Sequence, residues 1–212
     1  MKLYSAIDLH SNNSVLVILD ENDKVVYERR HPNELPVILA QLAPYKGKIQ
    51  AIAVESTYNW YWLVDGLIEA GYIVKLVNTA AVKVYEGLKY TGDEHDARHL
   101  AHLLRLGVLP TGHIYPKEER AVRDLLRKRA QLVRCRTTQI LSIQGLVSRN
   151  SGRRITTDGI RKLNDETIGQ FCGGDSVLAL AIQSNLTVLR CLDEQVSGLE
   201  AVVLKQAKLK PE

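Results

Sequence analysis

The amino-acid sequence predicts a mixed α/β domain followed by a long helical segment. Short apolar runs joined by tight polar turns open the chain, and apolar runs then alternate with helical spacings as far as residue 106. Heptad spacings dominate from residue 118 onward. The 212 residues leave room for one large domain or two small ones. The sequence predicts two, at 1–115 and 116–212.

Three short strands open the predicted sheet. Residues 3–9 and 15–19 are apolar and are separated by the turn cluster 10–13, and a third run follows at 25–29. Short runs with tight polar connections are typical of an antiparallel meander. An ordinary doubly wound fold would not begin with a meander.

Helices and strands alternate after the meander. Near-continuous apolar runs are typical of buried central strands, whereas apolar residues three and four apart indicate helices. These segments are helix 34–42, strand 49–54, helix 60–70, strand 72–77 and helix 93–106. Gly71 and Gly107 close two of the helices. The resulting order, β-β-β-α-β-α-β-α, matches the ribonuclease H-like layout.

The second half is predicted to form two long helices, at about 118–149 and 176–208. Each would be roughly 45–50 Å long at 1.5 Å per residue, and each must bury an apolar stripe. The connector 150–175 would allow an antiparallel pair within the chain, while a second copy could equally cover the stripes. The stripe residues, seven apart, are Leu126, Val133, Ile140 and Val147, then Ile182, Leu189, Val196 and Val203.

Charge is distributed unevenly along the chain. The net charge is +4, yet residues 117–154 hold 11 Lys and Arg against 3 Asp and Glu. Basic charge in one segment is typical of a polyanion binder, although a solvated helix face is the simpler alternative. Three widely spaced cysteines and the lack of a signal-like or membrane-length apolar stretch lead us to expect a cytoplasmic protein.

Four acidic residues stand at the ends of predicted elements. Asp8 ends the first strand, Glu55 follows the buried run 49–54, and Asp93 and Asp96 lie one turn apart at the start of a helix. Each alone has an ordinary explanation as a turn or helix-start acid. Together they would form a cluster that needs divalent cations, Mg²⁺ being the usual choice. Two such ions can support phosphoryl transfer.

Several motifs resemble a known family. The segments AIDLHSN at 6–12, VESTYNW at 54–60 and GDEHDAR at 92–98 resemble the DEDD transposases of the insertion-sequence-110 family, relatives of the Piv DNA invertase. The segments 114–120 and 123–129 also resemble that family, so the likeness covers essentially the whole chain. It implies a RuvC-like catalytic domain followed by a basic coiled-coil and oligomerisation segment.

The resemblance implies a function on DNA. Asp8, Glu55, Asp93 and Asp96 would be the catalytic tetrad that binds Mg²⁺ or Mn²⁺ for phosphoryl transfer in transposition or site-specific recombination. A structured guide RNA would select the DNA, and the chain would form a homo-oligomer without a membrane partner. Basic residues would contact nucleic-acid phosphates. They are Arg120, Arg123, Arg127, Lys128, Arg134, Arg149, Arg153 and Arg154.

Two features depart from the family pattern. Gly92 stands between Thr91 and Asp93, where many members have Thr directly before the Asp. Family members also continue into a second domain that carries a serine nucleophile, whereas this sequence stops at Glu212. We therefore expect an N-terminal half, for which complete strand exchange needs the further domain.

The sequence also allows other functions. A Holliday-junction resolvase-like nuclease would cut DNA with the tetrad alone, and a non-catalytic RNA-binding and oligomerisation module would not cut at all. A sugar-kinase or actin-like half would need a phosphate-binding glycine loop. Neighbours of the tetrad have alternative roles as solvated, core or substrate-contacting residues. They are His10, Thr57, Tyr58, Trp60, Tyr61, Trp62 and His95.

Overall fold

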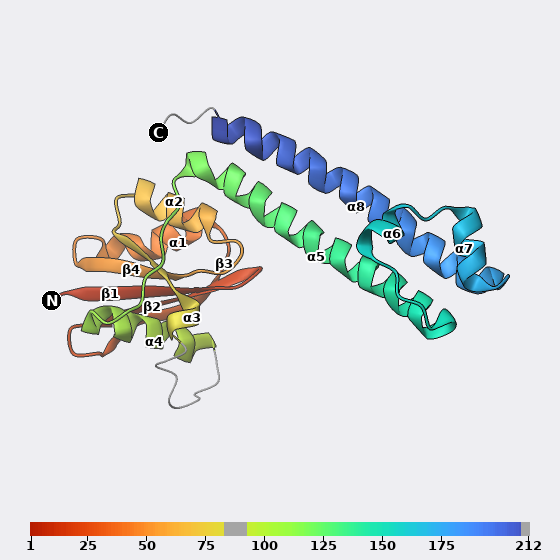
Figure 1. Ribbon diagram of the computed structural model, residues 1–212. Coiled ribbons are helices and arrows are strands. Elements are labelled where there is room, and N and C mark those ends of the chain that lie inside the picture. Colours follow the sequence, from red (N-terminus) through yellow and green to blue (C-terminus); the bar gives the residue numbers. More distant parts are fainter. Residues whose placement is uncertain (83–92, 209–212) are drawn as a thin grey trace. The chain divides into compact units, whose positions relative to one another are not determined.

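The computed structural model describes residues 1–82 and 93–208, without the side chains of residues 93, 94, 207 and 208. Contacts within the described chain divide it into two compact units, Met1–Ile114 and Tyr115–Glu212. Unit 1 contains the sheet, and unit 2 contains the long helices (Figure 1).

Within the described residues, five strands of unit 1 form one mixed sheet in the order β3-β2-β1-β4-β5. The first three strands are antiparallel, β4 pairs in parallel with β1, and β5 pairs in parallel with β4. This order confirms the predicted ribonuclease H-like fold. The strands are β1 (Leu3–Leu9), β2 (Asn13–Asp20), β3 (Val25–Pro32), β4 (Ile49–Glu55) and β5 (Val74–Val77).

Helices cover both faces of the sheet. On one face, α1 and α2 bury Ile38 and Leu63 against strand residues such as Ile7 and Ile52. On the other, α4 packs its alanines and leucines against β1, β2 and β4. Besides the short η1 (Ala43–Tyr45) and α3 (Thr79–Val82), the helices of unit 1 are α1 (Leu35–Leu42), α2 (Tyr61–Glu69) and α4 (Asp93–Leu106). The predicted bounds of α4 are confirmed.

Unit 2 is built on α5 (Lys117–Ser151) and α8 (Ser176–Lys208), which pack against each other. Arg129 donates a hydrogen bond to Glu200, which lies toward the end of α8. Ser142, further along α5, accepts a hydrogen bond from Asn185, which lies nearer the start of α8. The two helices therefore form an antiparallel pair within the chain, one of the two arrangements that the sequence left open. None of the described helices has the length and apolar content needed to span a membrane.

The buried stripe of unit 2 agrees with the predicted one except at its start. Val147, Ile182, Leu189 and Val196 of the predicted stripe are buried, whereas the predicted stripe residue Leu126 is exposed. An α-helix drifts about 20° per heptad, so a strict seven-residue spacing rotates out of the seam over three heptads. This drift explains why the prediction was wrong at Leu126.

The connector between the long helices contains two short helices that the sequence reading did not identify, α6 (Thr157–Arg161) and α7 (Asp165–Cys172). Thr156 and Asn164 cap them, because their side-chain oxygens accept hydrogen bonds from backbone N–H groups at 3.1 Å and 2.9 Å. Gly152 ends α5 at a φ of 68°. These caps were signals in the sequence, and α6 and α7 complete the apolar core of unit 2.

Candidate active site

The first two acids of the predicted tetrad lie at the ends of adjacent parallel strands. The register places Ile7 beside Val54, so the next residues lie side by side, Asp8 one residue before the end of β1 and Glu55 at the end of β4. Side chains alternate between the faces of a strand, and Ala6 and Ala53 face α4. Asp8 and Glu55, two residues further on, therefore share the face that α4 covers.

Contacts along α4 bring its first turn to the same edge of the sheet. Its last turns bind the turn between β2 and β3, where Arg105 Nε donates to Asp23 at 2.9 Å and His102 Nδ1 lies 2.7 Å from the same carboxylate. Arg98, nearer the start, forms an ion pair with Glu28 of β3. The β2–β3 turn lies at the opposite end of the sheet from Asp8, so the helix start lies toward Asp8.

Electrostatics show that three of the four acids interact. Burial, a side-chain hydrogen bond with Asp8 and the negative charges of Asp8 and Asp96 raise the pKa of Glu55 to about 8. Asp96 itself is exposed, while Asp8 is only 3% exposed. The structure thus places Asp8 beside Glu55, and Asp96 near enough for its charge to act on Glu55. Asp93 begins α4, but its side chain lies outside the described residues.

The donor chemistry fits a hard cation. Asp8 Oδ2 is buried and makes no hydrogen bond within the described residues, and His10 Nε2 lies 3.1 Å from it. Carboxylate oxygens are the ligands that Mg²⁺ takes. Among the side chains described, a set that lacks Asp93, no group of three or more His, Cys, Asp or Glu is close enough to hold a metal ion.

Two asparagines tie the loops around the acids together. The His10 carbonyl accepts hydrogen bonds from Asn33 Nδ2 at 2.9 Å and from Asn59 Nδ2 at 3.0 Å. Thr57 Oγ1 donates to Asn59 Oδ1 at 2.8 Å. The loop after β1 is therefore fastened to the turn after β4, which fixes Asp8 relative to Glu55. This role of Asn33 and Asn59 was not predicted from the sequence, where the only signal is an asparagine close after β3 and after β4.

The aromatic residues after Glu55 divide into two groups. Trp60 is buried in the core, and Tyr61 and Trp62 pack partly against it. Tyr58 is 80% exposed. Of the histidines considered, His95 is exposed and His10 is half-buried.

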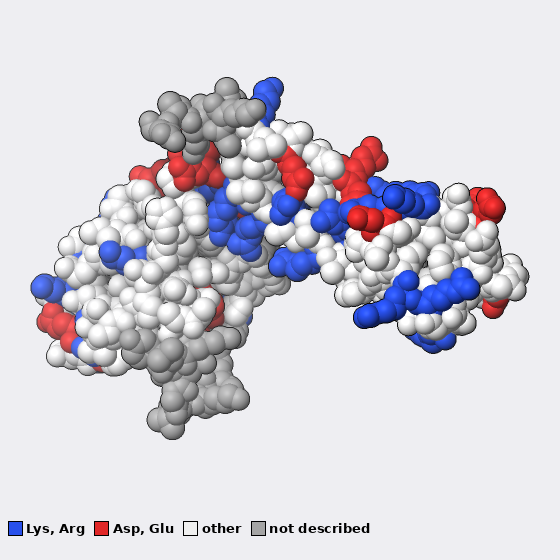
Figure 2. Space-filling model, viewed as in Figure 1, with Lys and Arg blue, Asp and Glu red and all other residues white. Residues whose placement is uncertain are grey.

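The basic residues of unit 2 also fall into two groups. Arg120 is buried and donates to the Tyr115 carbonyl at 2.9 Å, while the guanidinium of Arg123 lies 4.7 Å from the centre of the Tyr115 ring. On the face shown in Figure 2, Lys and Arg side chains gather over the end of unit 2 that carries α6. The remaining predicted residues are exposed: Arg127, Lys128, Arg134, Arg149, Arg153 and Arg154.

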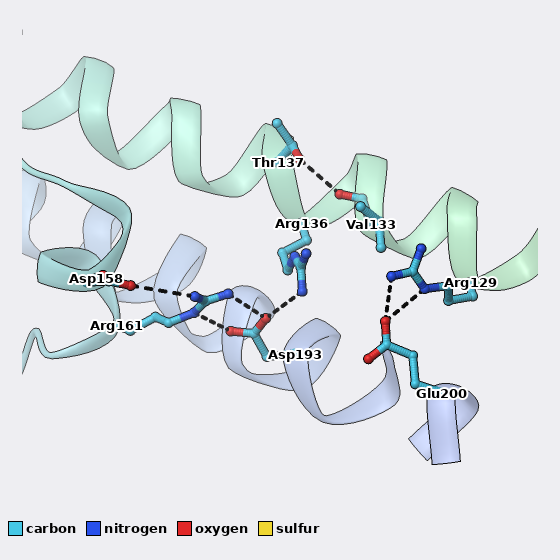
Figure 3. A network of polar contacts seen from close by, with 8 residues as sticks. All are labelled: Arg129, Val133, Arg136, Thr137, Asp158, Arg161, Asp193 and Glu200. Atoms are coloured by element: carbon cyan, nitrogen blue, oxygen red, sulfur yellow. Dashed lines mark hydrogen bonds and ion pairs between the residues drawn. The ribbon is translucent and has the colours of Figure 1, made fainter. Parts of the chain in front are cut away.

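Other arginines of unit 2 bind carboxylates (Figure 3). Asp193 of α8 accepts hydrogen bonds from Arg161 of α6 at 3.0 Å and from Arg136 of α5 at 3.2 Å. Arg129 donates to Glu200 at 2.8 Å. Hydrogen bonds and charge from Arg161, and then those from Arg136, hold the pKa of Asp193 below its ordinary value against the opposing effect of burial. These pairs connect α5, α6 and α8 within unit 2.

The sheet order and the acids at the ends of β1, β4 and the start of α4 define a ribonuclease H-like domain of the kind found in nucleic-acid-processing enzymes. Residues 6–150 match the DEDD transposase family of the insertion-sequence-110 type, whose description is "Transposase". The chain belongs to this transposase family. The match confirms the resemblance drawn from the sequence motifs.

Two further comparisons add little. No curated protein matches the chain. Among solved structures, the chain is similar to the large terminase nuclease from thermophilic phage G20c, with 14% sequence identity and a TM-score of 0.32. The matched region covers 59% of this chain and 62% of the terminase nuclease chain. A likeness at this level carries no functional argument.

Proposed function

We propose that unit 1 carries the DNA-processing site of this transposase, in which Asp8, Glu55, Asp93 and Asp96 bind Mg²⁺ or Mn²⁺. The observation that supports the proposal is the register that places Asp8 and Glu55 side by side on adjacent parallel strands, where burial and the charges of Asp8 and Asp96 raise the pKa of Glu55 to about 8. Acidic groups that repel one another in a partly buried site are stabilised by a divalent cation.

The side chains have distinct tasks in this proposal. Asp8 and Glu55 are held by two adjacent strands, so their spacing is set by the sheet and by the asparagine contacts to His10. Glu55 keeps its proton at neutral pH in the metal-free protein, and it must release that proton to ligate. Bound ions would lower the pKa of an attacking hydroxyl group and stabilise the leaving oxygen of a phosphodiester.

Unit 2 supplies the proposed RNA- and DNA-binding surface. Its exposed basic side chains suit the phosphates of a structured guide RNA and of DNA, which Arg and Lys contact without reading sequence. The surface consists of Arg127, Lys128, Arg134, Arg149, Arg153 and Arg154. We leave Arg120 out because it is buried, and Arg123 because its guanidinium packs on Tyr115. Assembly into a homo-oligomer, and joining of DNA strands with a serine-bearing domain, also belong to the proposal.

Metal binding and DNA cleavage test the site directly. Calorimetric titration with Mn²⁺ should show binding to the wild-type chain and a loss of at least tenfold in affinity in Asp8→Asn. Glu34→Gln, the same kind of change at an exposed position on the same unit, should bind as the wild type does. Equal Mn²⁺ affinity in Asp8→Asn and the wild type would remove Asp8 from the site.

A gel with labelled duplex DNA, branched DNA and structured RNA in Mn²⁺ then separates the alternatives. Binding without cutting means that the residues present recognise nucleic acid but do not cut it by themselves. Cutting that is lost in Asp8→Asn means that the tetrad acts alone, as in a resolvase-like nuclease. Binding of RNA only, with Mn²⁺ affinity unaffected by Asp8→Asn, favours a non-catalytic RNA-binding module.

A further inference from the structure

Tyr58 has the most exposed large hydrophobic side chain in the described part of the chain, at 80%. A single exposed apolar residue carries no meaning by itself. The position of this one in the fold is what distinguishes it. It lies three residues after Glu55, in the turn that follows β4, at the sheet edge where Asp8 and Glu55 meet.

The turn holds Tyr58 in place through its neighbours. The Thr57 N–H donates to the Glu55 carbonyl at 3.0 Å, and the Thr57 hydroxyl donates to Asn59 Oδ1 at 2.8 Å. Asn59 in turn donates to the His10 carbonyl at 3.0 Å, and Trp60 is buried in the core. The residues on both sides of Tyr58 are thus anchored while its own side chain stays in solvent. Because the backbone around Tyr58 is already ordered, little further backbone entropy is lost when its side chain binds a ligand.

The chemistry of the surroundings limits what the ring can bind. Asp8, Glu55 and Asp96 make this edge acidic, so a bare anion would be repelled unless cations intervene. The tyrosine ring, in the turn that follows Glu55, offers a flat, uncharged face to solvent. Nucleobases stack on such faces, and stacking tolerates any base sequence because every base has a π-face.

We propose that Tyr58 stacks on an unpaired nucleobase of the DNA strand whose phosphate enters the carboxylate site. The inference rests on the proposed function. A base must be unpaired or at a strand end because a paired base inside a duplex has both faces covered by its neighbours. Tyr58 would hold the strand beside the acids, and its effect would be on affinity for DNA with open bases and much smaller for closed duplex.

The test measures binding in the full chain carrying Asp8→Asn, so that cleavage does not interfere. Tyr58→Ala should weaken binding of a gapped or single-stranded DNA by roughly 5- to 100-fold, and Tyr58→Phe should keep most of the affinity because it retains the ring. A 2-aminopurine base in the gap should be quenched on binding to the Phe variant but not to the Ala variant. The quenching reports stacking itself, which a merely structural role of Tyr58 would not produce.

Ile73→Ala is the matched control. Ile73 is also strongly exposed, at 63%. It precedes the first residue of β5, whereas Glu55 pairs with the last residue of β5, so the two lie at opposite ends of the parallel strands. The Ile73→Ala variant should bind the gapped DNA with the same affinity as the Asp8→Asn chain from which it is made. Equal affinity of Tyr58→Ala and its parent for gapped DNA, or a loss seen only with RNA, overturns the inference while leaving the Mn²⁺ result for Asp8 untouched. A chain that binds none of the DNA probes overturns the inference and the proposed DNA function together.

Discussion

Glu55 in unit 1 and Asp193 in unit 2 are both partly buried carboxyl groups, yet their pKa values move in opposite directions. Burial and the neighbouring acids Asp8 and Asp96 raise the pKa of Glu55 to about 8. Hydrogen bonds from Arg161 and Arg136 lower the pKa of Asp193. The first group lies among like charges, and the second is neutralised by side chains of its own unit.

The difference separates a site that needs a ligand from one that is complete. A carboxyl group surrounded by acids destabilises the metal-free protein when it ionises, and either a proton or a bound cation removes this effect. A carboxylate that bridges two arginines from different helices already has its counter-charge and serves to connect them. The same residue type therefore indicates function in one unit and structure in the other.

The largest expected effect is on the pH dependence of the free energy of unfolding, which Glu55 influences. Between about pH 4.5 and pH 8 the unfolded chain has lost this proton while the folded chain keeps it, so the free energy of unfolding falls as the pH rises. Glu55→Gln removes this effect. Without divalent ions, we expect the free energy of unfolding of the variant to rise by about 2–3 kcal/mol relative to that of the wild type as the pH goes from 5 to 8.5. This figure is reduced for solvent screening.

Urea unfolding at several pH values with EDTA measures this difference. Glu34→Gln, at an exposed position, should show no pH-dependent gain. Saturating Mn²⁺ should reverse the order, because it stabilises the wild-type site that the variant has weakened. A constant difference between Glu55→Gln and wild type from pH 5 to pH 8.5 would contradict the raised pKa.

A smaller effect is expected at Asp193. Asp193→Ala leaves Arg136 and Arg161 facing each other without their shared acceptor, and we expect a loss of about 1–2 kcal/mol in the stability of unit 2. Glu194→Ala, at the exposed neighbouring position, should cost less than about 0.5 kcal/mol. Denaturation followed by helical circular dichroism compares the two.

The pH dependence of the Asp193 contribution has the opposite sign to that of Glu55. Its folded pKa is lowered, so its stabilisation is fully present above the ordinary aspartate pKa of about 3.9 and is lost as the pH falls through the folded value. The difference between wild type and Asp193→Ala should therefore shrink below about pH 4. A difference that grows in acid would show that another group dominates.

Much of the fold could be predicted because its signals are local. The runs at 3–9 and 49–54 gave β1 and β4, and the glycine at 107, whose φ is 73°, marked the end of α4. Seven-residue spacings identified buried residues such as Val147 and Leu189 but not the whole length of α5, since 3.6 residues per turn rotates Leu126 out of the seam. The connector helices were missed although Thr156 and Asn164 carry cap signals.

The candidate site was predictable as a set of acids but not as a set of contacts. Strand ends and a helix start suffice to suggest that Asp8, Glu55 and Asp96 meet. Which polar groups fasten them is a matter of tertiary geometry, because Asn33 and Asn59 reach the His10 carbonyl from positions 23 and 49 residues away. Nor does composition distinguish an exposed arginine from buried Arg120.

The smallest expected effect lies at the pair between Arg129 and Glu200. Their side chains are 41% and 43% exposed, so water screens the attraction and competes for the hydrogen bonds. A double-mutant cycle with Arg129→Ala and Glu200→Ala should give a coupling energy of about 0.3–0.5 kcal/mol that declines in 1 M salt. A coupling above about 1.5 kcal/mol would place this pair with Asp193 as a major connection between α5 and α8. A value near zero would leave the antiparallel register to the buried residues around Ile143 and Leu186 and to the Asp193 contacts.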